Sequence, residues 1–235
     1  MPPTGYRRAP QPGELAERHP GRPSPWLDAR TAALRSSYIS GVVDAAERIA
    51  GPSPRAVLDF GCGDGLLLDV APEHWTIDAY DTDPAAREAA QDRFSRSSRR
   101  TTVYSDIVDI PENHYDVILA ISVFQYLRSE FDLLQTLTRL KSWLAVGSDS
   151  FALITDLPLH RRPVRDAFDL ARFVAAAGIR TGRVAALTGQ VHRPYHASLD
   201  ATEEVVARVA SEAGFSARHV AGISPLTSRS HFLLR

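Results

Sequence analysis

The sequence between residues 56 and 68, AVLDFGCGDGLLL, constrains the fold more than any other stretch of the chain. It begins with an apolar run, 57–60, of the kind that forms a short strand buried on both faces. Three glycines follow at alternate positions, Gly61, Gly63 and Gly65, before a second apolar run that predicts a helix. Glycine accepts positive φ and has no Cβ, so the backbone can turn tightly against a ligand, and the start of a helix offers free N–H groups. The stretch therefore predicts a nucleotide-type binding site.

The composition is typical of one soluble globular domain. The chain has 235 residues, of which 44% are hydrophobic and 23% are charged, enough for one sizeable core. The formal net charge of -1 gives no general electrostatic reason to bind nucleic acid or a membrane. No apolar run approaches the roughly 20 residues of a membrane span, and residues 1–25 lack the apolar stretch of a secretory signal. We therefore expect a cytoplasmic protein.

Three residues argue against other chemistries. Leu66 stands where a dinucleotide-binding fingerprint has its third glycine. Lys141 is the only lysine and lies in a helical segment, so the chain lacks a phosphate-binding loop lysine and the Tyr-x-x-x-Lys pair of short-chain dehydrogenases. Cys62 is the only cysteine, which excludes an intrachain disulfide. An NAD-dependent oxidoreductase is disfavoured on these grounds but stays open as an alternative.

The glycine-rich stretch carries a family resemblance. Residues 59–65, Asp-Phe-Gly-Cys-Gly-Asp-Gly, resemble the first motif of class I S-adenosylmethionine-dependent methyltransferases, D/E-x-G-x-G-x-G. The resemblance implies an α/β fold with a doubly wound, mostly parallel, seven-stranded Rossmann-like sheet and a C-terminal antiparallel strand. It also implies S-adenosylmethionine (SAM) as the cofactor, S-adenosylhomocysteine (SAH) as its product, and no metal.

The rest of the chain supplies strands and helices in the order that this fold requires. Further strands are predicted at 75–80, 101–104, 114–120, 151–154, 215–221 and 230–234. Helices are predicted at 26–50, 84–94, 130–144 and from a capping box at 200–203 to Gly214. Residues 1–25 are expected to be a flexible arm and residues 26–235 the methyltransferase domain. Within this domain, 26–50 is expected to be a capping helix and 157–199 a substrate cover.

Two expectations concern side chains on predicted helices and turns. The arginines at and after the end of the helix at 84–94 are expected to form a solvated turn; they are Arg93, Arg96, Arg99 and Arg100. Ser129 is expected to cap the helix at 130–144. The apolar face of that helix is predicted to comprise Phe131, Leu134, Leu137, Leu140, Trp143 and Leu144.

Two carboxylates follow the strand at 75–80, and one of them is a candidate for binding the ribose. Asp81 follows the strand at 75–80, where a carboxylate can accept hydrogen bonds from ribose hydroxyls; a plain turn aspartate is the alternative. Asp83 is better explained as the N-cap before Pro84.

The resemblance assigns further residues to the cofactor. It implies that Asp106 bonds the adenine amino group, that Ile107 packs on the ring, and that Arg30 and Tyr38 reach the methionine carboxylate. The alternative for Arg30 and Tyr38 is a packing helix whose arginine is solvated. The predicted cofactor-binding residues are Arg30, Tyr38, Asp59, Gly61, Cys62, Gly63, Gly65, Asp81, Thr82, Asp106, Ile107 and Ile121.

The methyl acceptor is expected to contact the cover and the loop after the fourth strand. His192 and His196 are candidate catalytic bases, because the histidine pKa of about 6.5 suits that role; a solvated or structural histidine is the alternative for each. Candidate substrate contacts are Tyr126, His160 and Tyr195. Tyr126 stands where many members of the resembling family have histidine.

These features predict SAM-dependent methyl transfer to oxygen or nitrogen of a small molecule, a sugar or a secondary metabolite. The loop after the fourth strand lacks the Asn/Asp-Pro-Pro-aromatic signature and the chain lacks a Pro-Cys pair, which argues against a nucleobase acceptor. The expected partner is a small-molecule acceptor, with no nucleic acid and no membrane, for a monomer or homodimer. The alternative is a SAM-binding enzyme that does not methylate, a pseudoenzyme or a regulatory subunit.

Overall fold

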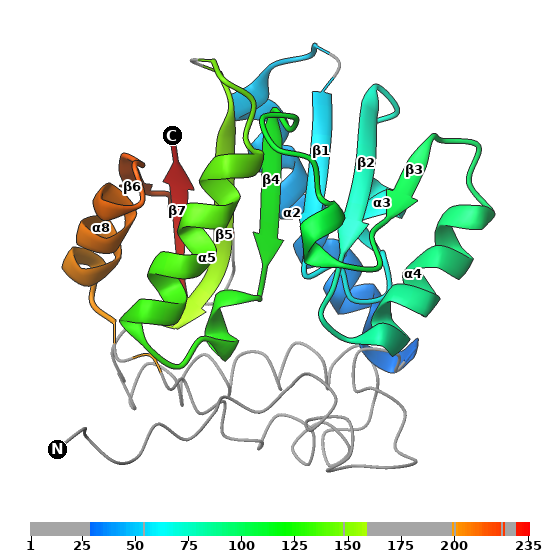
Figure 1. Ribbon diagram of the computed structural model, residues 1–235. Helices are drawn as coiled ribbons and strands as arrows, with labels where there is room; N and C mark the ends of the chain where they lie inside the picture. The colour runs from blue at the N-terminus through cyan, green and yellow to red at the C-terminus, as the bar shows by residue number, and fades with distance from the viewer. Residues whose placement is uncertain are drawn as a thin grey trace, which may run out of the picture.

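The computed structural model describes residues 29–53, 55–147, 149–158, 199, 201–221, 223 and 229–235, in which strands and helices alternate (Figure 1). The helices are α2 (Ala29–Ala50), α3 (Leu67–Val70), α4 (Pro84–Ser95), α5 (Glu130–Trp143) and α8 (Glu203–Glu212), with the short 3₁₀ turns η2 (Ile107–Asp109) and η3 (Phe124–Tyr126). The strands are β1 (Arg55–Phe60), β2 (Trp75–Tyr80), β3 (Thr101–Val103), β4 (Val117–Ile121), β5 (Phe151–Pro158), β6 (Ala217–His219) and β7 (Arg229–Leu234).

The strands form one seven-stranded sheet in the order β3-β2-β1-β4-β5-β7-β6. The first five strands in this order are parallel, whereas β7 is antiparallel to both β5 and β6. The chain runs outward from β1 to β3 on one side and restarts at β4 on the other. This reversal places a topological switch point between β1 and β4, where ligands of open α/β sheets bind beyond the carboxyl ends of the strands. The predicted fold class is confirmed.

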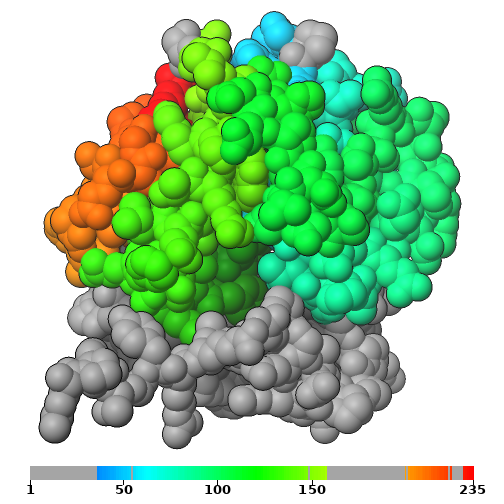
Figure 2. Space-filling model, viewed as in Figure 1, coloured from blue at the N-terminus to red at the C-terminus, as the bar shows by residue number. Residues whose placement is uncertain are grey.

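Alternation along the strands separates two apolar cores on the two faces of the sheet. On one face, Leu58 and Ile118 pack with the buried sides of α5 and α8. On the other, Val57 and Leu119 pack with α2 and with apolar residues of α3 and α4. Figure 1 shows α5 in front of the sheet and α2 behind it, and in the space-filling view α8 and α4 lie on opposite sides of α5 (Figure 2).

Helix α5 confirms its predicted cap but corrects its predicted face. The Ser129 hydroxyl accepts the Asp132 N–H at 3.1 Å, as expected for an N-cap. Phe131, however, is 65% exposed, whereas Leu133 is fully buried together with Leu137 and Leu140. Positions 133, 137 and 140 follow the helical spacing i, i+4, i+7. The buried apolar stripe of the helix therefore contains Leu133 and not Phe131.

The last helix begins later than predicted. The Thr202 hydroxyl accepts the Val205 N–H at 3.3 Å, so Thr202 is the N-cap and the helix starts at Glu203. The capping box expected at 200–203 is therefore wrong as a helix start. Gly214, with φ of 82°, ends the helix where the sequence predicted.

The arginines after α4 are not all solvated, which corrects the expectation for two of them. The Arg93 Nε–H donates to the Asp64 carbonyl at 2.8 Å, and its guanidinium pairs with Asp69. The Arg99 guanidinium donates to the carbonyls of Ala71, at 2.7 Å, and Pro72, at 3.2 Å. These hydrogen bonds tie the end of α4 to the segment that follows the glycine turn.

Replacing Arg99 with alanine should destabilise the fold, because two backbone carbonyls lose their partner. Arg99→Ala is expected to lower the free energy of unfolding by roughly 1–2 kcal/mol. Exposed Arg100 is the matched control, and Arg100→Ala should change stability by less than about 0.5 kcal/mol. Urea denaturation measures both variants, and equal effects would mean that Arg99 is solvated after all.

Candidate cofactor and acceptor site

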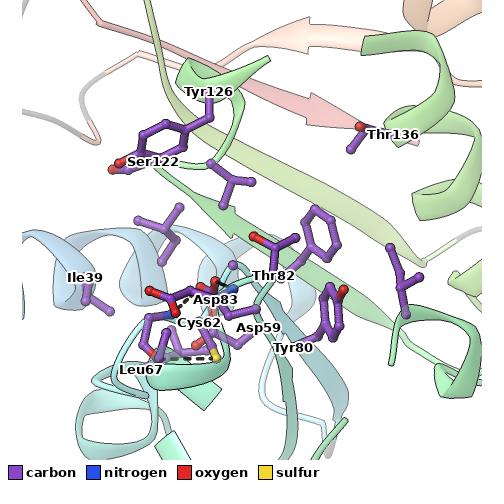
Figure 3. A pocket seen from close by; sticks show the side chains of 18 of the residues that line it. Ile39, Asp59, Cys62, Leu67, Tyr80, Thr82, Asp83, Ser122, Tyr126 and Thr136 are labelled. Atoms are coloured by element: carbon purple, nitrogen blue, oxygen red, sulfur yellow. Dashed lines mark hydrogen bonds between the residues drawn. The ribbon is translucent and has the colours of Figure 1, made fainter. Parts of the chain in front are cut away.

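A pocket of about 670 Å³ lies at the carboxyl ends of β1, β2 and β4, at the switch point of the sheet. Figure 3 shows Asp59, Cys62 and Asp83 gathered on one side of it and Ser122 with Tyr126 on another. Ten of the predicted site residues line this pocket: Tyr38, Asp59, Gly61, Cys62, Gly63, Asp81, Thr82, Ile107, Ile121 and Tyr126. The structure thus brings together residues from six segments that are up to 88 positions apart (126 minus 38).

The glycine turn depends on glycine at each of its three positions. Gly61, Gly63 and Gly65 have φ of 79°, 55° and 75°, in the left-handed region. A Cβ on Gly61 would lie 2.3 Å from Cγ2 of Val123, and one on Gly65 would lie 2.9 Å from the Phe94 ring. Because Gly65 has no Cβ, helix α4 can pack against the turn. The sequence had instead suggested that Gly65 contacts the ligand directly. Gly61 and Gly63 are the two that line the pocket.

The predicted helix after this turn is present and short. Helix α3 contains the four residues Leu67–Val70, with Leu67 and Leu68 buried. Its first residue, Leu67, lines the pocket together with the turn.

Asp81 braces the glycine turn as well as lining the pocket. Its Oδ2 accepts the Gly63 N–H and its Oδ1 accepts the Asp83 N–H, each at 2.9 Å. Burial raises the pKa of the Asp81 carboxyl, and these two backbone hydrogen bonds act in the opposite direction. The turn contacts of the alternative interpretation are therefore present, and the ribose contact stays a prediction. Asp83 caps α4 by accepting the Ala85 N–H at 3.0 Å, as expected.

Asp81→Ala should weaken SAM binding by roughly 1–3 kcal/mol, or about 5- to 150-fold, because a carboxylate that holds the turn and faces the ligand is removed. Asp92→Ala, at an exposed position of α4, is the matched control and should leave binding unchanged. Calorimetric titration of each variant with SAM gives the comparison. Wild-type affinity in Asp81→Ala would remove Asp81 from the site.

Asp59 makes the pocket acidic. The side chain is 4% exposed at the end of β1 and lines the pocket. Burial, reinforced by the charges of Asp81 and Asp64, raises the pKa of Asp59 to about 8. A cation beside this carboxyl would relieve both effects. The site therefore favours a positively charged ligand.

Cys62 contributes a wall rather than a reactive group. Its side chain is buried, with Sγ 3.6 Å from the Gly63 carbonyl oxygen. Burial and the neighbouring carboxylates raise the pKa of the Cys62 thiol, which keeps it protonated and unreactive.

The turn after β3 presents one of its two predicted residues to the pocket. Asp106 is exposed and caps η2 by accepting the Val108 N–H at 3.2 Å. Ile107, the next residue, lines the pocket, and Asp106 does not. Asp106 is not part of the pocket wall, and its contact with adenine stays a prediction.

Several predicted residues lie outside the described part of the chain. They are the side chain of Arg30 and the whole of His160, His192, Tyr195 and His196. The candidate bases and two of the three substrate contacts thus stay predictions. Of the expected cover at 157–199, only residues 157, 158 and 199 are described.

The sequence analysis missed several residues of the pocket wall. Thr136 and Arg139 reach it from α5, which was expected only to pack on the sheet. Their spacing of three positions on the helix edge beside the apolar stripe is the signal that would have found them. Tyr80 and Ser122 also line it, at the ends of β2 and β4. Strand ends in parallel sheets meet at one edge, which is the general signal for both.

No group of three or more His, Cys, Asp or Glu side chains in the described ranges is arranged to hold a metal ion. None of the described helices is both long and apolar enough to cross a membrane.

The sheet order, the glycine turn and the pocket at the switch point are those of the class I Rossmann-like methyltransferase fold. A family model described as "Methyltransferase domain" matches residues 58–149, which are 92 of the 235 residues of the chain. The predicted resemblance is confirmed.

Two curated relatives are similar to this chain. Malonyl-[acyl-carrier protein] O-methyltransferase of Halalkalibacterium halodurans is 35% identical over 143 residues, which cover 55% of this chain and 49% of the relative. Trans-aconitate 2-methyltransferase of Rhodococcus jostii is 30% identical over 136 residues, 52% of each protein. The chain thus spans about half the length of these relatives.

Solved structures share the fold at low sequence identity. Magnesium protoporphyrin IX methyltransferase of Synechocystis, with bound SAH, has a TM-score of 0.58 and 15% identity, covering 95% of this chain and 94% of that one. The plantazolicin methyltransferase BpumL, also with SAH, has a TM-score of 0.58 and 16% identity, covering 89% and 87%.

Proposed function

We propose that the protein transfers a methyl group from SAM to oxygen or nitrogen of a small molecule, a sugar or a secondary metabolite. The observation that carries this proposal is the acidic glycine-turn pocket. Asp59 and Asp81 line it together with Gly61 and Gly63, so it offers carboxyl groups whose ionised form a bound cation would favour, and close backbone approach in one place. SAM carries a sulfonium and an ammonium, which is the charge that such a pocket favours.

The residues of this chain would bind and orient the reactants. When bound, SAM supplies an electrophilic methyl group, and the transfer is an in-line displacement at that carbon. The protein's contribution is to hold the acceptor in line and exclude water. No nucleophilic side chain is required, which agrees with the protonated and buried thiol of Cys62.

A small-molecule acceptor is supported by charge and by the relatives. The balanced net charge of -1 argues against a large polyanionic substrate. The two curated relatives are named for malonyl-[acyl-carrier protein] and trans-aconitate, and the structural neighbour BpumL is named for plantazolicin.

The test uses SAM labelled in its methyl group. The full chain is incubated with it and a panel of sugars, carboxylic acids, phenols and peptide-derived heterocycles, and labelled products are identified by mass spectrometry. Heat-inactivated protein is the control. Label in one class of product supports the proposal and names the acceptor class. SAM and SAH binding without any transfer would favour the non-methylating alternative, and no binding would refute both.

A further inference from the structure

Two residues of the β4 and β5 region have an unusual backbone. Ser122 follows β4 with φ of 60°, and Asp156 lies in β5 with φ of 64°. In the described ranges, Asn113 is the third non-glycine residue with positive φ. Such a conformation is uncommon outside glycine and persists where the surrounding structure enforces it, often at functional sites. Ser122 and Asp156 therefore share this conformation on neighbouring strands.

A β-bulge produces the geometry of Asp156. In the β5–β7 ladder, Ile154 pairs with Phe232 and Leu157 with Ser230, so Thr155 and Asp156 together oppose one residue, His231. A bulge of this kind re-aims the side chain of the extra residue. In this strand the bulge turns the Asp156 carboxylate toward Ser122 after β4. Regular alternation of side chains along β5 would have directed it to one face of the sheet.

His231 holds this bulge in place. Its Nδ1 accepts the Asp156 N–H at 3.2 Å, a hydrogen bond that replaces the ladder partner lost at the bulge. The imidazole is 3% exposed, and burial lowers the pKa of His231 to about 4, so the ring is neutral and its Nδ1 can accept.

Ser122 is fixed at three atoms. Its N–H donates to the Thr155 carbonyl at 3.2 Å, and its carbonyl accepts the Gln125 amide at 2.8 Å. Its hydroxyl donates to Oδ2 of Asp156 at 2.7 Å. Because the carboxylate only accepts, the hydroxyl proton lies toward Asp156, and Oγ offers its lone pairs elsewhere.

The Ser122 side chain belongs to the pocket wall. It lies beside Tyr126 in Figure 3, across the pocket from Asp59 and Cys62. A hydroxyl that donates to a carboxylate is polarised, which makes its oxygen a stronger hydrogen-bond acceptor. Ser122 therefore presents an oriented acceptor atom, not a freely rotating hydroxyl, to whatever enters the pocket.

We propose that Ser122, oriented by Asp156, accepts a hydrogen bond from the proton-bearing group of the methyl acceptor, its hydroxyl or amine. Asp156 acts through Ser122, and His231 acts through Asp156, so both are positioning residues. This inference rests on the proposed function, because it assigns the acceptor side of the same pocket.

The test compares two analogues of SAM and needs no knowledge of the acceptor. SAH lacks the methyl group, whereas sinefungin has an amine-bearing carbon in place of the methylated sulfur and so brings a hydrogen-bond donor to that position. Wild-type protein is expected to bind sinefungin at least about tenfold more tightly than SAH. Ser122→Ala and Asp156→Asn should each reduce this preference to under about threefold, with SAH affinity within about twofold of wild type.

Matched variants separate this role from a general structural one. Asp149 is exposed and lies just before β5, at the amino end of this strand and away from the pocket. Asp149→Asn should therefore keep the full preference for sinefungin. The variant S122A/D156N should lose no more than either single variant, because the two residues act as one unit. His231→Leu should lose the preference and His231→Asn, which retains an acceptor oxygen, should recover part of it.

Failure of the proposed function and failure of the assignment of Ser122 give different binding results. If wild-type protein binds neither analogue, the proposed function fails. If it binds SAH but shows no preference for sinefungin, or if Ser122→Ala retains the wild-type preference, the assignment of Ser122 is overturned. Because Ser122→Ala removes a single oxygen from a partly exposed residue, it tests the assignment even if Asp156→Asn does not fold.

Discussion

Gly61→Ala is expected to reduce SAM affinity by more than about 100-fold. The added Cβ would lie 2.3 Å from Cγ2 of Val123, and φ of 79° strains any residue except glycine. Because Gly61 lines the pocket and joins β1 to the turn, the backbone must shift where the ligand binds. Calorimetric titration with SAM and a thermal shift with SAH give the measurement.

A second substitution separates the steric effect from loss of the fold. Val123→Ala removes Cγ2 and leaves the Cβ of residue 123 at 3.4 Å from the methyl group added to residue 61. The double variant G61A/V123A should therefore recover part of the affinity, while the backbone strain at residue 61 remains. Wild-type affinity in Gly61→Ala alone would mean that this turn does not form the cofactor site.

The second large effect is a pH dependence of SAM binding that disappears in Asp59→Asn. With a pKa of about 8, the Asp59 carboxyl is mostly protonated at pH 6, and a bound cation favours its ionised form. Wild-type affinity should rise with pH by up to about tenfold per unit between pH 6 and 7.5, with release of one proton. This range lies below the usual pKa of about 7.8 for the cofactor's own amine. Titrations in buffers of different ionisation enthalpy count the protons.

The stability of the unliganded protein should show the opposite trend. The folded pKa of Asp59 is raised above its unfolded value of 3.8, so the folded state holds the extra proton between those two values. The stabilisation that this proton gives to the folded state is therefore complete at low pH. It is lost as pH rises toward about 8, and the free energy of unfolding falls by up to about 1.4 kcal/mol per pH unit. Asp59→Asn, which cannot ionise, should be the more stable protein at pH 8 in urea denaturation. Equal slopes for both proteins between pH 6.5 and 8 would contradict this origin.

Local patterns in the sequence predicted the cofactor half of the site. The apolar run before Gly61 specifies a buried strand, and the alternate glycines specify a turn that only they can adopt. Asp81 was expected to follow the strand at 75–80, and it lies in the pocket wall because strand ends in a parallel sheet share one edge. In each case the informative residues lie within a few positions of one another.

The side of the pocket that we propose for the methyl acceptor could not be predicted, because it depends on tertiary pairing. Asp156 looked like the simple end of a strand, and nothing within β5 shows that β7 places one residue opposite two. The orientation of α5 was misjudged for a similar reason: Phe131 is as apolar as Leu133, and only the position of the sheet decides which of them is buried. Arg99 resembled a solvated arginine because its carbonyl partners lie 27 and 28 positions away.

The insertion of β7 between β5 and β6 has a kinetic consequence. The segment between Pro158 and Arg229 must close before His231 can meet Asp156, and contacts this distant in sequence form slowly. The turn at 61–65 and its brace at Asp81 are separated by only 18 positions between Gly63 and its partner. A refolding chain should thus form the glycine turn and its brace at Asp81 before it forms the contact between His231 and Asp156.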